Sequence, residues 1–274
     1  MRILISADME GVTGVTTWNQ VTPGHAEYAR FRRMMTGDVN AAVRGAVAGG
    51  ADSVTVTDGH WDGSNILVEE LQAGAVLNSG SPTPLSIMQG IEDGVQGVLF
   101  VGYHARHGSE KAVLDHTWSS TCVHNVWLNG VLAGEYTLNA ALAGHFGAPI
   151  LMATGDQTAC DQIAAQIPTI ETVVVKMASG RFSAECLPGS IAHGRIEEAA
   201  KRGVERLAKK EAPEAYLVKA PVQLVIELQT SDMADRAALF PGARRDGLKV
   251  SATAPDMVEA QAAFRSLVSL SYPL

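Results

Sequence analysis

The sequence predicts an α/β fold with a mainly parallel sheet and helices on both faces, followed by a smaller C-terminal α+β unit. Short apolar runs of β-prone residues alternate with longer segments whose apolar residues recur at helical spacing, which is typical of a βαβ chain. After Pro213 the elements become shorter and the alternation changes. We therefore expect a main α/β domain over residues 1–212, which holds the functional site, and a smaller α+β subdomain over residues 213–274.

Composition and charge exclude several classes of partner. The chain has 274 residues, 46% of them hydrophobic, which is enough for one large core. A formal net charge of -8 and the lack of a long Lys/Arg cluster disfavour nucleic acid as a partner. No apolar run approaches the length of a membrane span and no secretion signal precedes the first strand, so we expect no membrane partner and a cytoplasmic location.

The cysteines do not form a recognisable framework. Cys122, Cys160 and Cys186 are too few and too scattered for a set of disulfides or a cysteine zinc site. We therefore expect them to be buried and to act as small apolar residues.

The first half of the chain alternates strands with helices. Residues 3–5 form a brief apolar run without helical spacing, as in the first strand of a parallel sheet. Residues 25–49 carry apolar side chains at helical spacing and end at a pair of glycines. Residues 53–57 are β-branched and predict a second strand, joined to the first by a right-handed parallel crossover. A helix over 65–71, a third strand over 97–101 and a polar loop over 105–111 are expected next.

The second half begins with a hairpin signal. Asn129-Gly130, between expected strands over 123–128 and 131–133, favours a type I′ turn. The remaining expected elements are helices over 135–146, 158–166, 191–210, 231–239 and 257–270 and strands over 149–153, 172–177, 222–228 and 248–253.

Two acids follow the first strand directly. Asp8 and Glu10 are two residues apart, so on an extended backbone their side chains point to the same side. Open α/β sheets bind ligands at the carboxyl ends of their strands, which makes this pair a candidate for metal binding or proton transfer. The alternative is that one acid caps a helix or lies solvated in a turn.

Three more potential ligands fall at comparable positions. His60 and His104 follow the second and third strands, and Glu135 opens a helix after the hairpin. With Asp8 and Glu10 they form an oxygen and nitrogen set without sulfur, which suits zinc and also manganese, cobalt or iron. Two ions fit better than one, because a carboxylate such as Asp8 can bridge them and both can activate one water. Taken singly, each histidine could be a hydrogen-bonded structural residue, and the helix dipole favours Glu135 in any case.

His116 is the remaining candidate for chemistry. It could act as a general base, as a general acid toward a leaving amine, or as a group that stabilises an oxyanion. The equally weighted alternative is a histidine outside the ligand set that hydrogen-bonds a ligand carboxylate.

Motifs around these residues match those of a known family. Ser6-Ala7-Asp8-Met9-Glu10-Gly11 fits the signature Ser-x-Asp-x-Glu-Gly of the bacterial zinc D-aminopeptidases, the DppA-like metallopeptidases, which the chain resembles over nearly its whole length. The likeness continues through Asp58-Gly59-His60, Gly102-Tyr103-His104-Ala105, His116, Asn129 to Glu135, Pro149 to Met152, Gly155-Asp156 and Met257 to Ala260.

The resemblance implies a two-zinc site and a peptidase activity. Asp8 would bridge the two ions. Glu10 and His104 would complete the coordination of one ion, and His60 and Glu135 would complete that of the other. His116 would be the catalytic histidine. Such enzymes release the N-terminal residue from short peptides, the known type preferring small D-residues such as D-alanine. A hydroxide formed from the shared water would attack the peptide carbonyl. The resemblance also implies a homo-oligomer, a homodecamer of stacked rings.

Two other functional classes use similar residues. A metal-dependent amidase or phosphoesterase could employ the same dinuclear set, and a non-catalytic protein could use it to store metal or bind peptides. The resemblance does not fix substrate chirality, because family members need not all act on D-residues.

Overall fold

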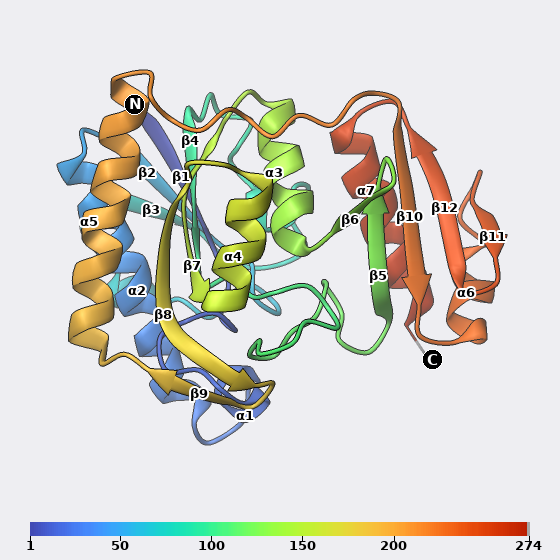
Figure 1. The fold of residues 1–274 in the computed structure, drawn as a ribbon, viewed down its shortest axis with the longest axis horizontal. Coiled ribbons are helices and arrows are strands. Elements are labelled where there is room, and N and C mark those ends of the chain that lie inside the picture. The colour runs from blue at the N-terminus through green and yellow to red at the C-terminus, as the bar shows by residue number, and fades with distance from the viewer. Residues whose placement is uncertain (273–274) are drawn as a thin grey trace.

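The computed structural model describes residues 1–272, which form two sheets with helices packed around them (Figure 1). The first sheet has seven strands, and all neighbouring pairs are parallel except the last, where β9 runs antiparallel to β8. Its spatial order is β3 (Ala75–Asn78), β2 (Ser53–Asp58), β1 (Arg2–Ala7), β4 (Gly97–Val101), β7 (Ile150–Asp156), β8 (Glu171–Gly180) and β9 (Ser183–Cys186).

Helices cover both faces of the first sheet, as the sequence predicts. Alternation along β1 sends Ile3 and Ile5 into one core, with α2 (Tyr28–Ala48) and α5 (Gly189–Ala208), and Leu4 into the other, with α3 (Glu135–His145) and α4 (Gln157–Gln166). Strands buried on both faces explain why these segments read as continuous apolar runs.

The second sheet is antiparallel and has five strands. Its order is β11 (Arg244–Asp246), β12 (Lys249–Ala254), β10 (Val222–Leu228), β5 (Val123–Leu128) and β6 (Val131–Ala133), with α6 (Ser231–Ala237) and α7 (Met257–Ser271) beside it. The predicted hairpin β5–β6 therefore joins a sheet whose other strands follow residue 213. The expected division at 212 stays a prediction.

Several short elements differ from expectation. The helix predicted over 65–71 is wrong: only a 3₁₀ turn, η1 (Val68–Glu70), forms, because Asp58 accepts hydrogen bonds from the amides of Asn65 and Ile66 and fixes that backbone in another conformation. A short helix, α1 (Trp18–Val21), lies within residues 16–24, which the sequence predicts as a polar loop, and a second 3₁₀ turn, η2 (Ser86–Met88), forms where the sequence predicts no element. The strands β3, β9 and β11 were also not predicted from the sequence. They lie at sheet edges and are too short to show a regular pattern of apolar residues.

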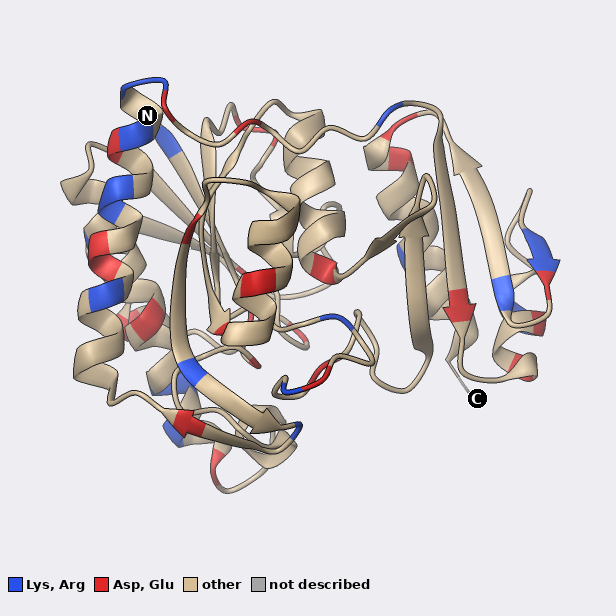
Figure 2. Cartoon of the chain, viewed as in Figure 1, with Lys and Arg blue, Asp and Glu red and all other residues tan. Residues whose placement is uncertain are grey.

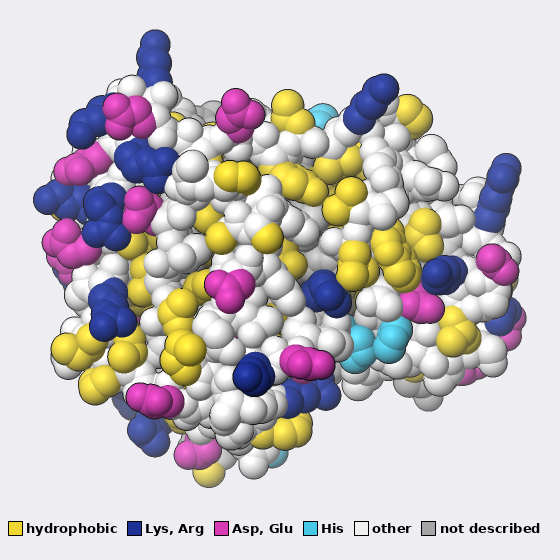
Figure 3. Space-filling model, viewed as in Figure 1, with side chains coloured by type: hydrophobic (Ala, Val, Ile, Leu, Met, Phe, Trp, Pro, Cys, Tyr) yellow, Lys and Arg dark blue, Asp and Glu magenta, His cyan; other side chains and the backbone are white. Residues whose placement is uncertain are grey.

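The surface is polar where α5 faces outward. Figure 2 shows that acidic and basic residues are interspersed along this helix, and Figure 3 shows their side chains mixed on the same part of the surface. Among residues 1–272, no helix combines the length and apolar character needed to cross a membrane. The expected cytoplasmic location stays a prediction.

Candidate metal centre

The two acids lie at the carboxyl edge of the first sheet. The amide of Asp8 donates to the carbonyl of Val101 at 2.9 Å, and the amide of Gly11 donates to the carbonyl of Gly102 at 2.8 Å, which ties this turn to the end of β4. A Cβ on Gly11 would lie 1.9 Å from the carbonyl oxygen of Tyr103, so only glycine permits this close approach. The side chains of Asp8 and Glu10 are both buried.

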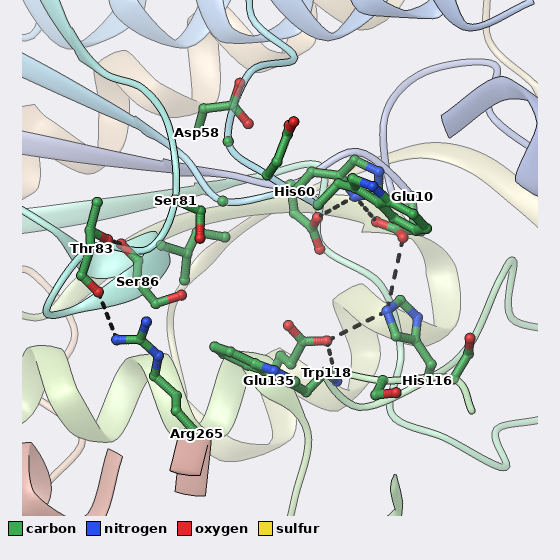
Figure 4. Close-up of a pocket in the computed structure, with 18 of the residues that line it drawn as sticks. Glu10, Asp58, His60, Ser81, Thr83, Ser86, His116, Trp118, Glu135 and Arg265 are labelled. Carbon is green, nitrogen blue, oxygen red and sulfur yellow. Dashed lines mark hydrogen bonds and ion pairs between the residues drawn. The ribbon is translucent and has the colours of Figure 1, made fainter. Parts of the chain in front are cut away.

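The structure brings the three later candidates to the same point. His60 Nδ1 lies 3.2 Å from Asp8 Oδ1 and 3.0 Å from Glu10 Oε2. His104 Nε2 lies 3.3 Å from Asp8 Oδ2 and 3.0 Å from Glu135 Oε2. The two oxygens of Asp8 thus face different histidines, which is the arrangement that a bridging carboxylate requires. Figure 4 shows how Glu10, His60 and Glu135 converge.

Both histidines present an unprotonated nitrogen to the cluster when neutral. His60 Nε2 lies 2.8 Å from the carbonyl of Val21, and His104 Nδ1 lies 3.0 Å from the carbonyl of Ala105. A neutral ring donates its one N–H to that carbonyl, so its other nitrogen carries a lone pair toward the carboxylates. Metal-binding histidines are commonly oriented in this way.

The cluster also contains polar atoms that protein partners do not satisfy. Glu10 Oε2 and His104 Nε2 are buried without a hydrogen bond of good geometry, although charged neighbours lie about 3 Å away. Asp8, Glu10 and His104 each offer one ligand atom within 4.8 Å of the others. Buried polar atoms without a partner are rare in proteins. These oxygen and nitrogen atoms are of the kinds that coordinate a metal cation, so they fit a shared ion.

His116 lies against the cluster. Its ring stacks on that of His104 with centroids 3.9 Å apart, and its Nδ1 lies 2.8 Å from the carbonyl of Leu114. Its Nε2 lies 3.9 Å from Glu10 Oε1 and 3.7 Å from Glu135 Oε2. His116, His104 and Glu135 form a second group of ligand atoms within 4.8 Å, so the position suits either a ligand or a proton carrier next to one.

Burial and charge shift the pKa values in opposite directions. Burial alone would raise the pKa of Asp8, but hydrogen bonds and charge interactions with His104 and His60 hold it well below the usual value. Burial opposes protonation of both histidines, yet the facing carboxylates raise their pKa values well above the usual one. Burial and the nearby His104 lower the pKa of His116. The pocket therefore favours positive charge among its carboxylates, which a divalent cation supplies.

Lys176 supports the acid-bearing turn and was missed from the sequence. This β8 residue is buried, and its Nζ donates to the carbonyls of Glu10, Val12 and Val15 at 2.6, 3.0 and 2.8 Å. Burial lowers its pKa to about 8. The available signal was a single cation inside the apolar run of residues 173–177, which is unusual for a buried strand.

A cavity of about 610 Å³ opens onto the cluster. Asp8, Glu10, His60, His116 and Glu135 all line it. So do three of the four tryptophans of the chain, Trp18, Trp61 and Trp118. The backbone amide of Trp118 also donates to Glu135 Oε2 at 2.6 Å, which orients that carboxylate. The volume of the cavity lies within the usual range for sites that bind small molecules, roughly 300 to 1,000 Å³.

Comparison with known proteins gives one consistent result. A family model described as D-aminopeptidase matches residues 1–266. D-aminopeptidase from Bacillus subtilis (strain 168) is 32% identical over 273 residues, which cover 99% of this chain and 98% of the relative. The solved structure of the Zn-dependent D-aminopeptidase DppA from Bacillus subtilis, a self-compartmentalizing protease, is similar with a TM-score of 0.95 and 31% identity. The match covers 99% of this chain and 98% of that one.

Proposed function

Because this chain belongs to the D-aminopeptidase family, peptidase family M55, we propose that it is a zinc aminopeptidase with two ions per subunit. Its substrates are short peptides, from which it releases the N-terminal residue, a small D-residue such as D-alanine. The observation that supports this function most directly is the placement of the two oxygens of Asp8, each of which faces a different histidine within 3.3 Å.

In this proposal Asp8 bridges the ions. Glu10 and His104 would complete the coordination of one ion. This agrees with the distances, since Asp8, Glu10 and His104 each offer one ligand atom within 4.8 Å of the others. His60 and Glu135 would complete the coordination of the other ion. The 3.0 Å contacts between His60 and Glu10 and between His104 and Glu135 would then join residues that hold different ions.

The residues of the chain divide the remaining work. Two bound cations supply Lewis-acid chemistry, which activates a water and polarises the peptide carbonyl. Neutral His116 donates its Nδ1–H to the carbonyl of Leu114, so an unprotonated Nε2 faces the cavity. Nε2 can accept a proton from the attacking water, and the resulting imidazolium can donate that proton to the departing amine or stabilise the oxyanion. The carboxylates at this end of the cavity bind the free α-amino group of the peptide, which accounts for removal of a terminal residue.

Metal analysis joined to a substrate panel tests this function. The purified protein should contain two zinc ions per chain, hydrolyse D-Ala-D-Ala faster than L-Ala-L-Ala, and leave a phosphate ester intact. Chelation should abolish turnover and zinc should restore it. Hydrolysis of the phosphate ester, or peptide binding without turnover in the zinc-loaded protein, would favour the other functional classes.

A matched pair of variants tests the ligand assignment. Asp8→Asn should lower the zinc content of both sites, because the bridging charge is lost. Asp62→Asn removes an acid that lines the same cavity but lies outside the proposed ligand set, so it should retain two zinc ions. Equal zinc content in the two variants would contradict the bridging role.

We also propose that this chain assembles into a homodecamer of stacked rings, which is in keeping with its similarity to a self-compartmentalizing protease. Large exposed apolar side chains, among them Val68, Leu217 and Leu239 at 66%, 75% and 76% exposure, are suitable for burial between subunits. Sedimentation velocity should give a mass near ten chains, and a monomer would exclude this assembly.

A further inference from the structure

The charges that line the cavity are distributed unevenly. Among its lining residues are five acids, Asp8, Glu10, Asp58, Asp62 and Glu135, and a single Lys or Arg, which is Arg265. Figure 4 shows Arg265 with Thr83 and Ser86 on one side of the cavity and Glu10, His60 and His116 on the other. The cavity thus has an acidic end at the candidate metal centre and a cationic group away from it.

Arg265 is held in place by its surroundings, and no acid among the described residues neutralises it. It lies in α7, and its Nη1 donates to the carbonyls of Thr83 and Pro84, both at 2.7 Å. Within residues 1–272 it forms no ion pair, and its Nε and Nη2 make no hydrogen bond. Partial burial lowers its pKa, as expected for a guanidinium partly removed from water without a counter-charge.

Hydroxyl groups accompany this guanidinium. Ser81 and Ser86 line the same side of the cavity, and their hydroxyls donate no hydrogen bond to other described residues. A fixed guanidinium with free donors, together with hydroxyl donors, is well suited to a planar carboxylate, which can accept two parallel N–H bonds.

We propose that Arg265 binds the C-terminal carboxylate of the peptide substrate. This inference rests on the proposed aminopeptidase function and identifies the substrate class more narrowly, as short peptides with a free C-terminus. The amino end of such a peptide lies at the carboxylates of the metal centre, and its carboxyl end reaches Arg265 within the same cavity. A peptide with opposite charges at its two ends therefore matches the charges of the cavity, whereas an amidated peptide leaves the guanidinium unpaired.

Matched substrates measure this interaction directly. For the zinc-loaded enzyme, kcat/KM should be about 10- to 100-fold higher for D-Ala-D-Ala than for D-Ala-D-Ala amide, the range expected for one hydrogen-bonded charge pair. Arg265→Gln should bring that ratio close to one, while Arg265→Lys should keep part of it. Arg236→Gln is the control, since Arg236 also donates to a backbone carbonyl, that of Tyr272, but does not line the cavity. It should keep the wild-type ratio.

A second readout does not depend on turnover. Calorimetry with the two peptides on the His116→Ala variant, which should keep zinc but lose turnover, should show the same preference for the free acid. Adding Arg265→Gln to that variant should remove the preference. If Arg265 only supports the loop of Thr83 and Pro84, Arg265→Gln alone lowers kcat/KM equally for acid and amide, and the carboxylate role is wrong. Equal kcat/KM for acid and amide in the wild-type enzyme would also overturn it. Tight binding of the free acid without hydrolysis by the wild-type protein would instead contradict the aminopeptidase function and uphold the carboxylate site.

Discussion

Replacement of Lys176 by methionine tests how the acid-bearing turn is held. Methionine has nearly the same length but no hydrogen to donate, so the carbonyls of Glu10, Val12 and Val15 lose their shared partner. All three residues are buried, so water cannot easily replace the lost donors. The substitution therefore separates the hydrogen-bonding role of the ammonium from its contribution to packing.

The magnitude follows from two opposing effects. The carbonyl of Val12 keeps the amide of Val15 as a donor at 3.2 Å, so two carbonyls, those of Glu10 and Val15, are left unsatisfied. At about 1 to 3 kcal/mol each, they cost roughly 2 to 6 kcal/mol. Burial holds the pKa of Lys176 at about 8 instead of 10.5, so removing the charge relieves about 3 kcal/mol at neutral pH. We expect a net destabilisation of about 1 kcal/mol, or a fall in melting temperature of roughly 2 to 4 °C.

Thermal unfolding of the metal-free protein and zinc titration together check this prediction. Lys176→Met should melt earlier and bind zinc more weakly, because the turn that carries Glu10 is no longer fixed. Lys201→Met is the matched control: Lys201 is 41% exposed and reaches Glu205 only at 4.0 Å, so its loss should change stability by less than about 0.5 kcal/mol. If Lys176→Met matches wild type in both melting and zinc affinity, the three hydrogen bonds do not hold the turn.

Three further predictions concern His116, Gly11 and the cysteines. His116→Ala should keep two zinc ions by elemental analysis yet lose turnover at least 100-fold, the usual contribution of a proton-transfer group; a fall to one zinc ion would make His116 a ligand. Gly11→Ala should lower the melting temperature and the zinc content, since its Cβ would lie 1.9 Å from a backbone carbonyl oxygen, and wild-type behaviour would contradict the close approach. Ellman's reagent should modify exposed Cys186 in the native protein but reach buried Cys122 and Cys160 only on unfolding, and burial raises the pKa of Cys160 to about 12. Fast reaction of more than one thiol would refute this assignment.

The candidate site was predictable wherever it depends on strand ends. Asp8, His60 and His104 each follow a β-prone apolar run, and parallel strands place their carboxyl ends at one edge of a sheet. Periodicity therefore located these residues without any tertiary information. Glu135 was found by a weaker signal, the turn between β6 and α3, yet its carboxylate reaches His104 at 3.0 Å.

Residues that act through distant contacts were not predictable. Lys176 reaches a carbonyl 166 positions earlier in the chain, and Arg265 reaches one 182 positions earlier. No local period encodes such a pairing, because it depends on how two sheets and their helices pack. The expectation that all cysteines are buried was wrong for a related reason: Cys186 is exposed in β9, an edge strand with which no other described strand pairs on its outer side.

The same long-range packing explains why residues after 213 matter to a site whose proposed ligands all precede them. β10 pairs with β5, and α7 packs on α3, so apolar residues of both parts, such as Val126, Leu224 and Phe264, belong to one core. Since Glu135 opens α3 and Arg265 projects from α7, this core fixes the position of a proposed metal ligand relative to the proposed carboxylate site.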